Sequence, residues 1–208
     1  MDLHDLRKNY IKNHLSEGDV NENPTEQFVA WFKEAQQSAI KEPNAMTLAT
    51  ATANGKPSAR IVLLKEVDEK GFVFFTNYLS RKGSEITANP QAALLFFWDV
   101  LERQIRVEGT LKKIAESESE NYFNSRPLES RIGAIISKQS CVVKSREALE
   151  LAFNKAKESS EIKRPQNWGG YLLVPAYFEF WQGGANRIHD RITYTKHQEN
   201  WLIQRLAP

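Results

Sequence analysis

The stretch that decides the fold reads Ala45-Met-Thr-Leu-Ala-Thr-Ala-Thr52, then Ala53-Asn54-Gly55-Lys56-Pro57, then Ser58-Ala-Arg-Ile-Val-Leu-Leu-Lys-Glu66. Its two outer parts are rich in β-branched and aliphatic residues, which favour extended strands. The dipeptide Asn54-Gly55 is preferred in tight hairpin turns because both residues tolerate positive φ angles. The stretch therefore predicts an antiparallel strand pair, and it begins a β-rich region.

Toward the C-terminus, short β-rich runs separated by turn signals continue. The further runs are Phe72–Thr76, Ala92–Trp98, Arg103–Ile114, Gly170–Val174, Tyr177–Trp181, Ile188–Thr195 and Trp201–Leu206. Predicted helices interrupt them near Ser117–Ser125, Glu129–Ile136 and Arg146–Ser159. Short, mainly antiparallel strands with peripheral helices predict an α+β domain built on a small closed barrel.

Toward the N-terminus, a helix is predicted from Pro24. Asn23 can cap it, and proline suits the first helical position because the missing N–H is not needed there. One apolar stripe at helical spacing contains Phe28, Trp31, Phe32, Ala35 and Ala39. Residues 1–23 are polar and predict a flexible arm or a partner-docking segment, which leaves residues 24–208 as a single domain.

The composition is that of an ordinary globular chain: 208 residues, 41% hydrophobic and 26% charged, with a net charge of +2. That charge is too near zero for a general nucleic-acid binder. Cys141 is the only cysteine, which excludes an intramolecular disulfide and a thiolate metal cage. The longest apolar run, Ala92–Trp98, is too short for a bilayer, and the N-terminus lacks a signal-peptide core. The expected location is the reducing cytoplasm.

Missing motifs restrict how a phosphate could be bound. No Gly-x-Gly-x-x-Gly follows a strand, and no Walker-type Gly-Lys-Ser/Thr is present, so side chains must hold any phosphate. A Gly-x-Ser-x-Gly nucleophile elbow is absent as well. His4, His14 and His197 lie in polar segments without metal-ligand spacing, so no metal site is predicted.

The most informative segment is Trp181-Gln-Gly-Gly-Ala-Asn-Arg187-Ile-His189-Asp-Arg191. As a strand from Arg187, its alternation would place Arg187, His189 and Arg191 on one face. Two guanidiniums and an imidazole repel each other unless an anion or a carboxylate sits among them. The segment therefore indicates either an anion site or a solvated strand face that pairs with acidic neighbours.

A second group consists of Tyr122, Arg126 and Ser130, four residues apart. Pro127 ends the first helix, so Ser130 falls in the first turn of the next helix. A phenol, a guanidinium, a hydroxyl and free helix N–H groups together suit a phosphate monoester. The same spacing also fits a surface helix on which Tyr122 packs against the stem of Arg126.

A third group contains Arg60 and Lys65, followed by Arg81-Lys82. An odd spacing points Arg60 and Lys65 to opposite faces of a regular strand. Either a bulge or a strand end turns one of them, or the two residues serve different parts of a site. For Arg81-Lys82, the prediction is a solvated basic pair in a loop. Spacing alone thus indicates a phosphate-binding barrel of unknown chemistry.

These residues belong to a longer series of motifs in one order along the chain. The series is Arg60-Ile-Val-Leu-Leu-Lys65, Phe75-Thr76-Asn77, Ser80-Arg81-Lys82, Leu101-Glu102-Arg103-Gln104, Tyr122-Phe-x-Ser125-Arg126-Pro127, Ser137-Lys138-Gln139-Ser140, Phe180-Trp181-Gln182-Gly183-Gly184, Arg187-x-His189-Asp190-Arg191 and Arg205-Leu206-Ala207-Pro208. Together they closely resemble the pyridoxine/pyridoxamine 5′-phosphate oxidase family over residues 45–208.

The resemblance implies an FMN-binding split barrel that works as a homodimer, with FMN sites at the subunit interface. The positions that match FMN contacts are Arg60, Lys65, Phe75, Thr76, Arg81, Lys82, Gln104, Gln139, Ser140, Trp181 and Arg191. The positions that match the clamp on the substrate phosphate are Lys65, Tyr122, Arg126 and Ser130. Arg187 and His189 match groups over the pyridine ring and are the candidate catalytic residues.

The activity that the resemblance implies belongs to vitamin B6 metabolism. Pyridoxine 5′-phosphate or pyridoxamine 5′-phosphate would be oxidised to pyridoxal 5′-phosphate, with O2 as the electron acceptor and H2O2 as the second product. Two alternatives stay open: a split-barrel flavin reductase that uses NAD(P)H, and a non-catalytic pyridoxal phosphate binding protein. The sequence departs from some relatives at Phe75, where they carry Tyr, and at Cys141, where Ser is common.

Overall fold

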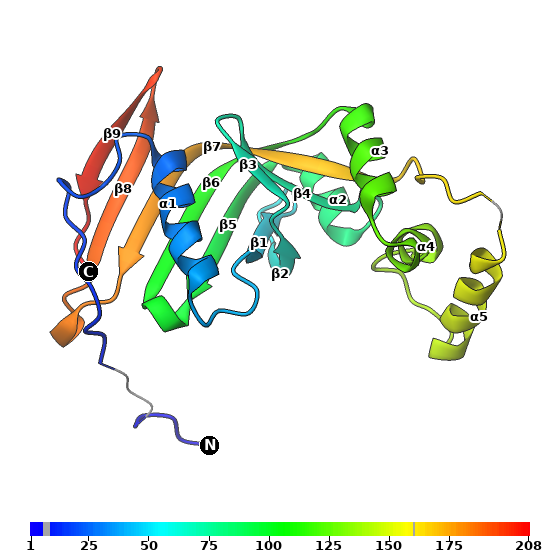
Figure 1. Cartoon of the computed structure of the whole chain (residues 1–208), viewed down its shortest axis with the longest axis horizontal. Coiled ribbons are helices and arrows are strands. Elements are labelled where there is room, and N and C mark those ends of the chain that lie inside the picture. The colour runs from blue at the N-terminus through cyan, green and yellow to red at the C-terminus, as the bar shows by residue number, and fades with distance from the viewer. Residues whose placement is uncertain (6–8, 160) are drawn as a thin grey trace.

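The computed structural model describes residues 1–5, 9–159 and 161–208. Its strands are β1 (Ala45–Ala51), β2 (Pro57–Leu63), β3 (Glu66–Asp68), β4 (Gly71–Asn77), β5 (Gln91–Trp98), β6 (Arg103–Lys113), β7 (Trp168–Gln182), β8 (Asp190–His197) and β9 (Asn200–Arg205). Its helices are α1 (Pro24–Gln37), α2 (Arg81–Ala88), α3 (Glu116–Ser125), α4 (Leu128–Ile136) and α5 (Arg146–Lys157), with 3-10 turns at Asp99–Leu101 and Ala185–Arg187. Figure 1 shows one curled sheet, with α3, α4 and α5 at the end opposite the β8–β9 hairpin.

The sheet is antiparallel throughout, and β7 is its branching strand. One edge of β7 pairs with β6, whereas the other edge pairs with β4 over residues 168–173 and with β8 over residues 177–182. Pro175, which has no N–H to donate, lies between these two ladders beside a bulge in the pairing with β6. Gly109 is required opposite it, because a Cβ atom there would lie 2.1 Å from the carbonyl oxygen of Val174. This change of partner along one edge of β7, from β4 to β8, is called the fork below, and it divides the sheet into two parts.

The first hairpin brings the opposite edge of the sheet toward β4. The strand pair predicted around Asn54-Gly55 is confirmed as β1 and β2, and Gly55 adopts a φ of 82° in the turn. β2 ends at Leu63, and two residues later the N–H of Lys65 donates to the carbonyl oxygen of Val73 on β4 at 2.9 Å. The curled sheet with peripheral helices confirms the predicted α+β antiparallel barrel.

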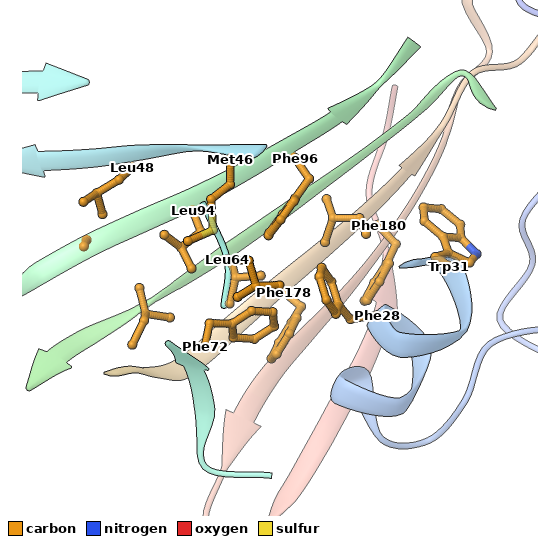
Figure 2. Packing of buried hydrophobic residues seen from close by; sticks show 14 of the residues in the cluster. Phe28, Trp31, Met46, Leu48, Leu64, Phe72, Leu94, Phe96, Phe178 and Phe180 are labelled. Atoms are coloured by element: carbon orange, nitrogen blue, oxygen red, sulfur yellow. The ribbon is translucent and has the colours of Figure 1, made fainter. Parts of the chain in front are cut away.

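The core lies between the inner face of the sheet and α1, which begins at the predicted Asn23 cap. Figure 2 shows the α1 side chains Phe28 and Trp31 among aromatic residues of the sheet. The Phe28 ring lies edge-on to Phe72 at 4.8 Å and 5.0 Å from Phe96, and Trp31 lies edge-on to Phe180 at 5.3 Å between centroids. Such edge-to-face contacts add to the free energy gained by burying the rings.

The described part of the N-terminal segment lies against the C-terminal strands. Leu15 is buried, and its N–H donates to the Asp190 carboxylate at 3.0 Å. Arg205 donates to the carboxylates of Glu17 at 2.9 Å and of Asp190 at 2.6 Å. These contacts place the segment, while the flexibility expected of residues 1–23 stays a prediction.

Two elements differ from the sequence-based expectation. Residues 81–88, expected as a loop, form α2, which the Ser80 hydroxyl caps by accepting from the N–H of Gly83 at 3.3 Å. The runs 170–174 and 177–181 form one strand, because the bulge at Pro175 lets β7 continue past the proline. Among the described residues, no helix combines the length and the apolar composition needed to cross a bilayer.

Replacing Phe28 with alanine should lower the free energy of unfolding by about 3–5 kcal/mol, because it empties a ring-sized volume at the centre of the core. Chemical denaturation of the variant would measure the change. Leu151→Ala on α5, at a side chain that is 72% exposed, is the control and should change stability by about 0.5 kcal/mol or less. Equal effects of the two substitutions would contradict this description of the core.

Candidate functional site

A cavity of about 880 Å³ opens between β2, β4, α3 and α4. The predicted site residues that line it are Arg60, Lys65, Phe75, Thr76, Lys82, Tyr122, Arg126, Ser130 and Gln139. Trp168 at the start of β7 also lines it, although no sequence pattern had selected this tryptophan. The structure thus brings residues that are far apart in the sequence together around one cavity, and Trp168 adds an aromatic ring to its wall.

Lys82 lies on one wall of the cavity and is only 9% exposed. Its ammonium group contacts the oxygens of Gln139 at 2.8 Å, Thr76 at 3.2 Å and Ser80 at 3.5 Å, all of which are neutral. Burial and the nearby Arg60 guanidinium lower the pKa of Lys82. The expectation of a solvated pair at Arg81-Lys82 is therefore wrong for Lys82, because α2 turns this side chain inward.

Arg60 lies beside Lys82 and is held by a carboxylate that the sequence reasoning missed. Glu85 on α2 accepts hydrogen bonds from Arg60 at 3.1 Å and from Arg81 at 2.9 Å. Burial alone would raise the pKa of Glu85, but hydrogen bonds from Ser58, Thr50, Arg81 and Arg60 outweigh it and lower the pKa to about 2. The four-residue spacing of Arg81 and Glu85 is the one signal that could have indicated this pair.

Lys65 follows the end of β2 rather than lying on its face. The strand end explains how Arg60 and Lys65 line one cavity despite their odd spacing. Of the explanations that the spacing left open, the structure shows a strand end rather than a bulge, and whether the two residues serve different parts of the site stays a prediction.

The opposite wall is formed where α3 ends and α4 begins. The Tyr122 ring stacks on Phe75 with 3.9 Å between centroids, and the Arg126 guanidinium lies 4.7 Å from the centre of the Trp168 ring. Ser130 lies in the first turn of α4, as predicted from Pro127. The surface-helix interpretation is wrong, because Tyr122 packs on Phe75 and both Tyr122 and Arg126 line the cavity, while the phosphate role of the group stays a prediction.

Arg126 carries the clearest sign of a missing anionic partner. Its buried Nη1 atom has no hydrogen-bond partner among the described residues, and burial lowers its pKa. A buried, unpaired guanidinium nitrogen is costly unless a ligand accepts its hydrogen bond. The cavity therefore presents two separate cationic groups, one at Arg60 and Lys82 and one at Arg126, and both fit phosphate groups.

Five of the remaining predicted residues form a second group on β6, on β7, on β8 and in the turn before β8, and none of them lines this cavity: Gln104, Trp181, Arg187, His189 and Arg191. Trp181 and His189 lie with 4.9 Å between ring centroids, and Gln104 is paired with Trp181 across the β6–β7 ladder. Tyr10 packs edge-on against both rings, at 5.6 Å from Trp181 and 5.9 Å from His189. Tyr10 is a third residue that the sequence reasoning missed, after Trp168 and Glu85, since it lies in a polar segment without a pattern.

His189 is oriented by the diglycine that precedes it. The N–H of Gly184 donates to the Nδ1 atom of His189 at 3.1 Å. In the neutral imidazole, Nδ1 is then the acceptor and the proton lies on Nε2. The ring therefore offers an Nε2–H donor on its other side.

The prediction of a strand face that contains Arg187, His189 and Arg191 is wrong in its geometry. Arg187 ends a 3-10 turn with a φ of 63°, next to Asn186 with a φ of 55°, and β8 begins only at Asp190. The carboxylate expected near these cations is Glu179, which accepts from Arg191 at 2.8 Å. Arg187 makes no hydrogen bond or ion pair within the described part of the chain, so its guanidinium is available for a ligand.

Arg81 and Ser140 lie outside the cavity lining. The Arg81 side chain is exposed apart from its bond to Glu85, and Ser140 has a φ of 73° in the loop after Gln139. The neighbouring Cys141 is exposed. The roles that the resemblance implies for these residues stay predictions.

Comparisons with known proteins agree on one family. Residues 32–160 match the family model described as pyridoxamine 5′-phosphate oxidase. The chain belongs to the pyridoxamine 5′-phosphate oxidase family. Residues 168–208 match a second model, the C-terminal dimerisation region of pyridoxine 5′-phosphate oxidase, which supports a homodimer.

Relatives in this family match over nearly the whole chain. A pyridoxine/pyridoxamine 5′-phosphate oxidase from Burkholderia mallei is 56% identical over 99% of both chains. One from Trichormus variabilis is 53% identical over 98% of this chain and 97% of its own length. These matches confirm the predicted family, and membership confirms FMN as its cofactor.

Solved structures show the same fold. PhzG from Burkholderia lata, in complex with tetrahydrophenazine-1-carboxylic acid, has a TM-score of 0.90 at 30% identity and covers 95% of this chain and 99% of its own. An FMN-binding protein from Nostoc punctiforme, related to pyridoxamine 5′-phosphate oxidase, has a TM-score of 0.74 at 18% identity. It covers 91% of this chain and 100% of its own. The split-barrel fold expected of the family is thereby confirmed.

Acid should remove the contribution of the Glu85 cluster to stability. The folded pKa of about 2 lies below the ordinary value, so this contribution is present above about pH 4.3 and is lost as the pH falls toward 2. Denaturation between pH 5 and 2.5 should show a smaller loss of stability in Glu85→Gln than in the wild type. Glu150→Gln, in the exposed ion pair with Arg146, is the control and should keep the wild-type slope. An unchanged slope in Glu85→Gln would contradict the depressed pKa.

Proposed function

We propose that the chain is an FMN-dependent oxidase that converts pyridoxine 5′-phosphate and pyridoxamine 5′-phosphate to pyridoxal 5′-phosphate, with O2 as electron acceptor and H2O2 as product. The observation that carries the proposal is the pair of cationic groups in one cavity, at Arg60 with Lys82 and at Arg126. A flavin mononucleotide and a phosphorylated substrate each bring one phosphate, and the cavity offers one cationic group to each. The curated relatives named for this reaction support the same substrates.

The first cationic group would bind FMN. Lys82 has only neutral acceptors around it, and Arg60 lies beside it with its charge partly offset by Glu85. Thr76 and Gln139 would complete the polar contacts, and Phe75 would lie against the cofactor. Gln104, Trp181 and Arg191 are remote from this wall, so we place them at the FMN site of the partner subunit in a homodimer that uses residues 168–208.

The second cationic group would hold the substrate phosphate. Arg126 provides the unpaired guanidinium nitrogen, and Ser130 provides a hydroxyl and the first turn of α4. Lys65 and the Tyr122 hydroxyl face the same cavity. Fixing the phosphate in this way would set the position of the pyridine ring, and such orientation is a large source of rate enhancement.

The redox chemistry, hydride acceptance from the C4′ carbon of the substrate and electron transfer to O2, would be supplied by bound FMN. Arg187 of the partner subunit would hold the ring through its unpaired guanidinium. His189 would donate from Nε2–H, because Gly184 already occupies Nδ1. In this arrangement His189 orients the substrate as a hydrogen-bond donor.

A second candidate is an oxidase of a non-phosphorylated acid, favoured by the structural match to PhzG with its bound tetrahydrophenazine-1-carboxylic acid. An arginine such as Arg126 can bind a carboxylate as well as a phosphate. The identity to the curated pyridoxine/pyridoxamine 5′-phosphate oxidases is higher, at 53–56% against 30%. We therefore place this activity, the NAD(P)H-dependent reductase and the non-catalytic pyridoxal phosphate carrier behind the main proposal.

An exposed, unpaired Cys141 accords with the cytoplasmic location that we propose.

Aerobic turnover tests the proposal directly. The FMN-loaded protein should form pyridoxal 5′-phosphate and H2O2 in equal amounts from pyridoxine 5′-phosphate or pyridoxamine 5′-phosphate. Tetrahydrophenazine-1-carboxylic acid and NADPH are the comparison substrates. Flavin bleaching by either of these, without turnover of the two vitamers, would move the function to the corresponding alternative.

Arg126→Ala should raise KM for pyridoxine 5′-phosphate by about tenfold or more, because a charge-assisted hydrogen bond to the phosphate is lost. Steady-state kinetics at saturating FMN would measure this. Arg146→Ala on the exposed face of α5 is the matched control. An unchanged KM in Arg126→Ala would remove this residue from the clamp.

Arg187→Leu should lower kcat/KM by about 100-fold or more while FMN stays bound, because Arg187 contacts the reacting ring rather than the phosphate. The positive φ at this position disfavours leucine and arginine alike, so the substitution adds no new backbone strain. Stopped-flow reduction of the bound flavin would isolate the chemical step. Wild-type reduction rates in the variant would refute the role.

A further inference from the structure

The Glu85 carboxylate is the most heavily bonded acidic group near the cavity, and no ligand contact explains it. Its side chain is 4% exposed. It accepts from the hydroxyls of Thr50 at 2.6 Å and Ser58 at 2.5 Å, and from the guanidiniums of Arg60 at 3.1 Å and Arg81 at 2.9 Å. Three of these donors, from Thr50, Ser58 and Arg60, share Oε2, and Arg81 donates to Oε1, so every contact of the carboxylate is made within the protein.

These contacts join three separate elements. Thr50 lies on β1, Ser58 and Arg60 lie on β2, and Arg81 and Glu85 lie on α2. The same hydroxyls also accept from Arg60, whose Nη1 lies 2.5 Å from the Thr50 oxygen and whose Nη2 donates to Ser58. The guanidinium of Arg60 is thus fixed against the helix that carries Lys82.

The net charge of the side chains around Glu85 suits the binding of a phosphate group. Arg60, Arg81 and Lys82 are three cations within one short stretch of surface and cavity wall, and Glu85 is the acidic group paired with them. The net charge of the four groups is +2, whereas a phosphate monoester carries about −1.5 to −2 at neutral pH. Without the carboxylate, three like charges would face each other whenever the phosphate is absent.

We propose that Glu85 is a positioning residue for the phosphate of FMN: it holds Arg60 and Arg81 beside Lys82 and offsets one of their three charges before the cofactor binds. The proposal rests on the assignment of Arg60 and Lys82 to the cofactor phosphate made above. It adds a role for a residue that touches neither cofactor nor substrate. Preorganised cations bind an anion more tightly because less ordering is left to the binding step.

A purely structural role would be different. If Glu85 only fastens α2 to the β1–β2 hairpin, its removal should weaken the whole cavity and every flavin ligand to the same extent. If it positions the cations that bind the phosphate, its removal should weaken the binding of FMN. The binding of riboflavin, which has the same ring and no phosphate, should be almost unchanged. The ratio of the two affinities therefore separates the roles.

The test uses the full-length apoprotein of the wild type, Glu85→Ala, Glu85→Gln and the control Glu150→Gln, titrated with FMN and with riboflavin by flavin fluorescence. Glu150 pairs with Arg146 four residues away at 2.8 Å, so it repeats the Arg81–Glu85 spacing on an exposed helix. Circular dichroism would establish that each variant is folded at the temperature of the titration.

We expect Glu85→Ala to raise the Kd of FMN by about tenfold or more, since two hydrogen bonds to charged groups lose their acceptor. Glu85→Gln should raise it by about threefold or more, because the amide keeps one acceptor and turns its NH2 toward a cation. The Kd of riboflavin should change by less than about twofold in each variant. Glu150→Gln should match the wild type with both ligands.

Unchanged FMN affinity in a folded Glu85→Ala protein would overturn the proposal, as would equal losses for FMN and riboflavin. Tighter FMN binding by Glu85→Gln would overturn it too, since Glu85 would then act only by repelling the phosphate. If Glu85→Ala does not fold, the Glu85→Gln titration decides. A wild type that binds FMN no better than riboflavin would instead contradict the placement of the cofactor phosphate, and the two failures are therefore distinguishable.

Discussion

The division of β7 between two neighbours is the constraint on which the rest of the structure depends. β6 accompanies this strand along its length, but β4 pairs with its first part and β8 with its last part. A proline at position 175 cannot donate to a ladder, and Gly109 allows the backbones to approach there. One strand therefore carries two ladders, and each ladder carries its own group of site residues.

The separation of the two groups follows from that fork. Thr76 at the end of β4 faces the cavity with Lys82, whereas Trp181 and Arg191 belong to the ladder with β8. Under the proposed assignment, a single chain holds two incomplete halves of a flavin site. Pairing each half with the other half of a second chain is the simplest way to complete both, and the match of residues 168–208 to a dimerisation region agrees with it.

A similar arrangement of charges occurs beside the cavity and beside the second group of site residues. Glu85 is shared by Arg60 and Arg81, and on the other side Glu179 is shared by Arg191 at 2.8 Å and Arg106 at 2.6 Å. In each case a buried carboxylate holds two arginines whose positions would otherwise be set only by flexible side chains. On both sides the carboxylate reduces the repulsion between the cations; a positive surplus remains around Glu85, whereas Arg106 also pairs with Glu108 at 3.1 Å.

Local signals in the sequence were sufficient for the parts of the fold that local interactions determine. The β1–β2 hairpin follows from Asn54-Gly55, and α1 follows from Asn23-Pro24 and the stripe that contains Phe28. α2 could not be found in this way, because eight residues give little periodicity. Its capping serine was visible, but the fit of the helix depends on tertiary contacts.

The candidate site was predictable in its residues rather than in its geometry. A series of motifs identified the family, whereas spacing alone left a phosphate clamp and a surface helix open for Tyr122 and Arg126. The strand expected at Arg187 is wrong because Asn186 and Arg187 adopt positive φ angles; asparagine is a residue type that tolerates this conformation, whereas arginine gives no such signal. Lys82 is buried through contact with Gln139, which is 57 residues away, and pattern reasoning does not reach that far.

The contacts of Leu15 have a consequence for the order in which the molecule can be assembled on the ribosome. Its N–H bonds to Asp190, 175 residues away, and its carbonyl oxygen accepts from Arg205, 190 residues away. Contacts of such sequence separation form late, because the chain between them must be made and closed first. The cavity-lining residues 60–168 precede both of these partners in the chain, whereas the bond from Arg205 to Leu15 can form only after the last strand has left the ribosome.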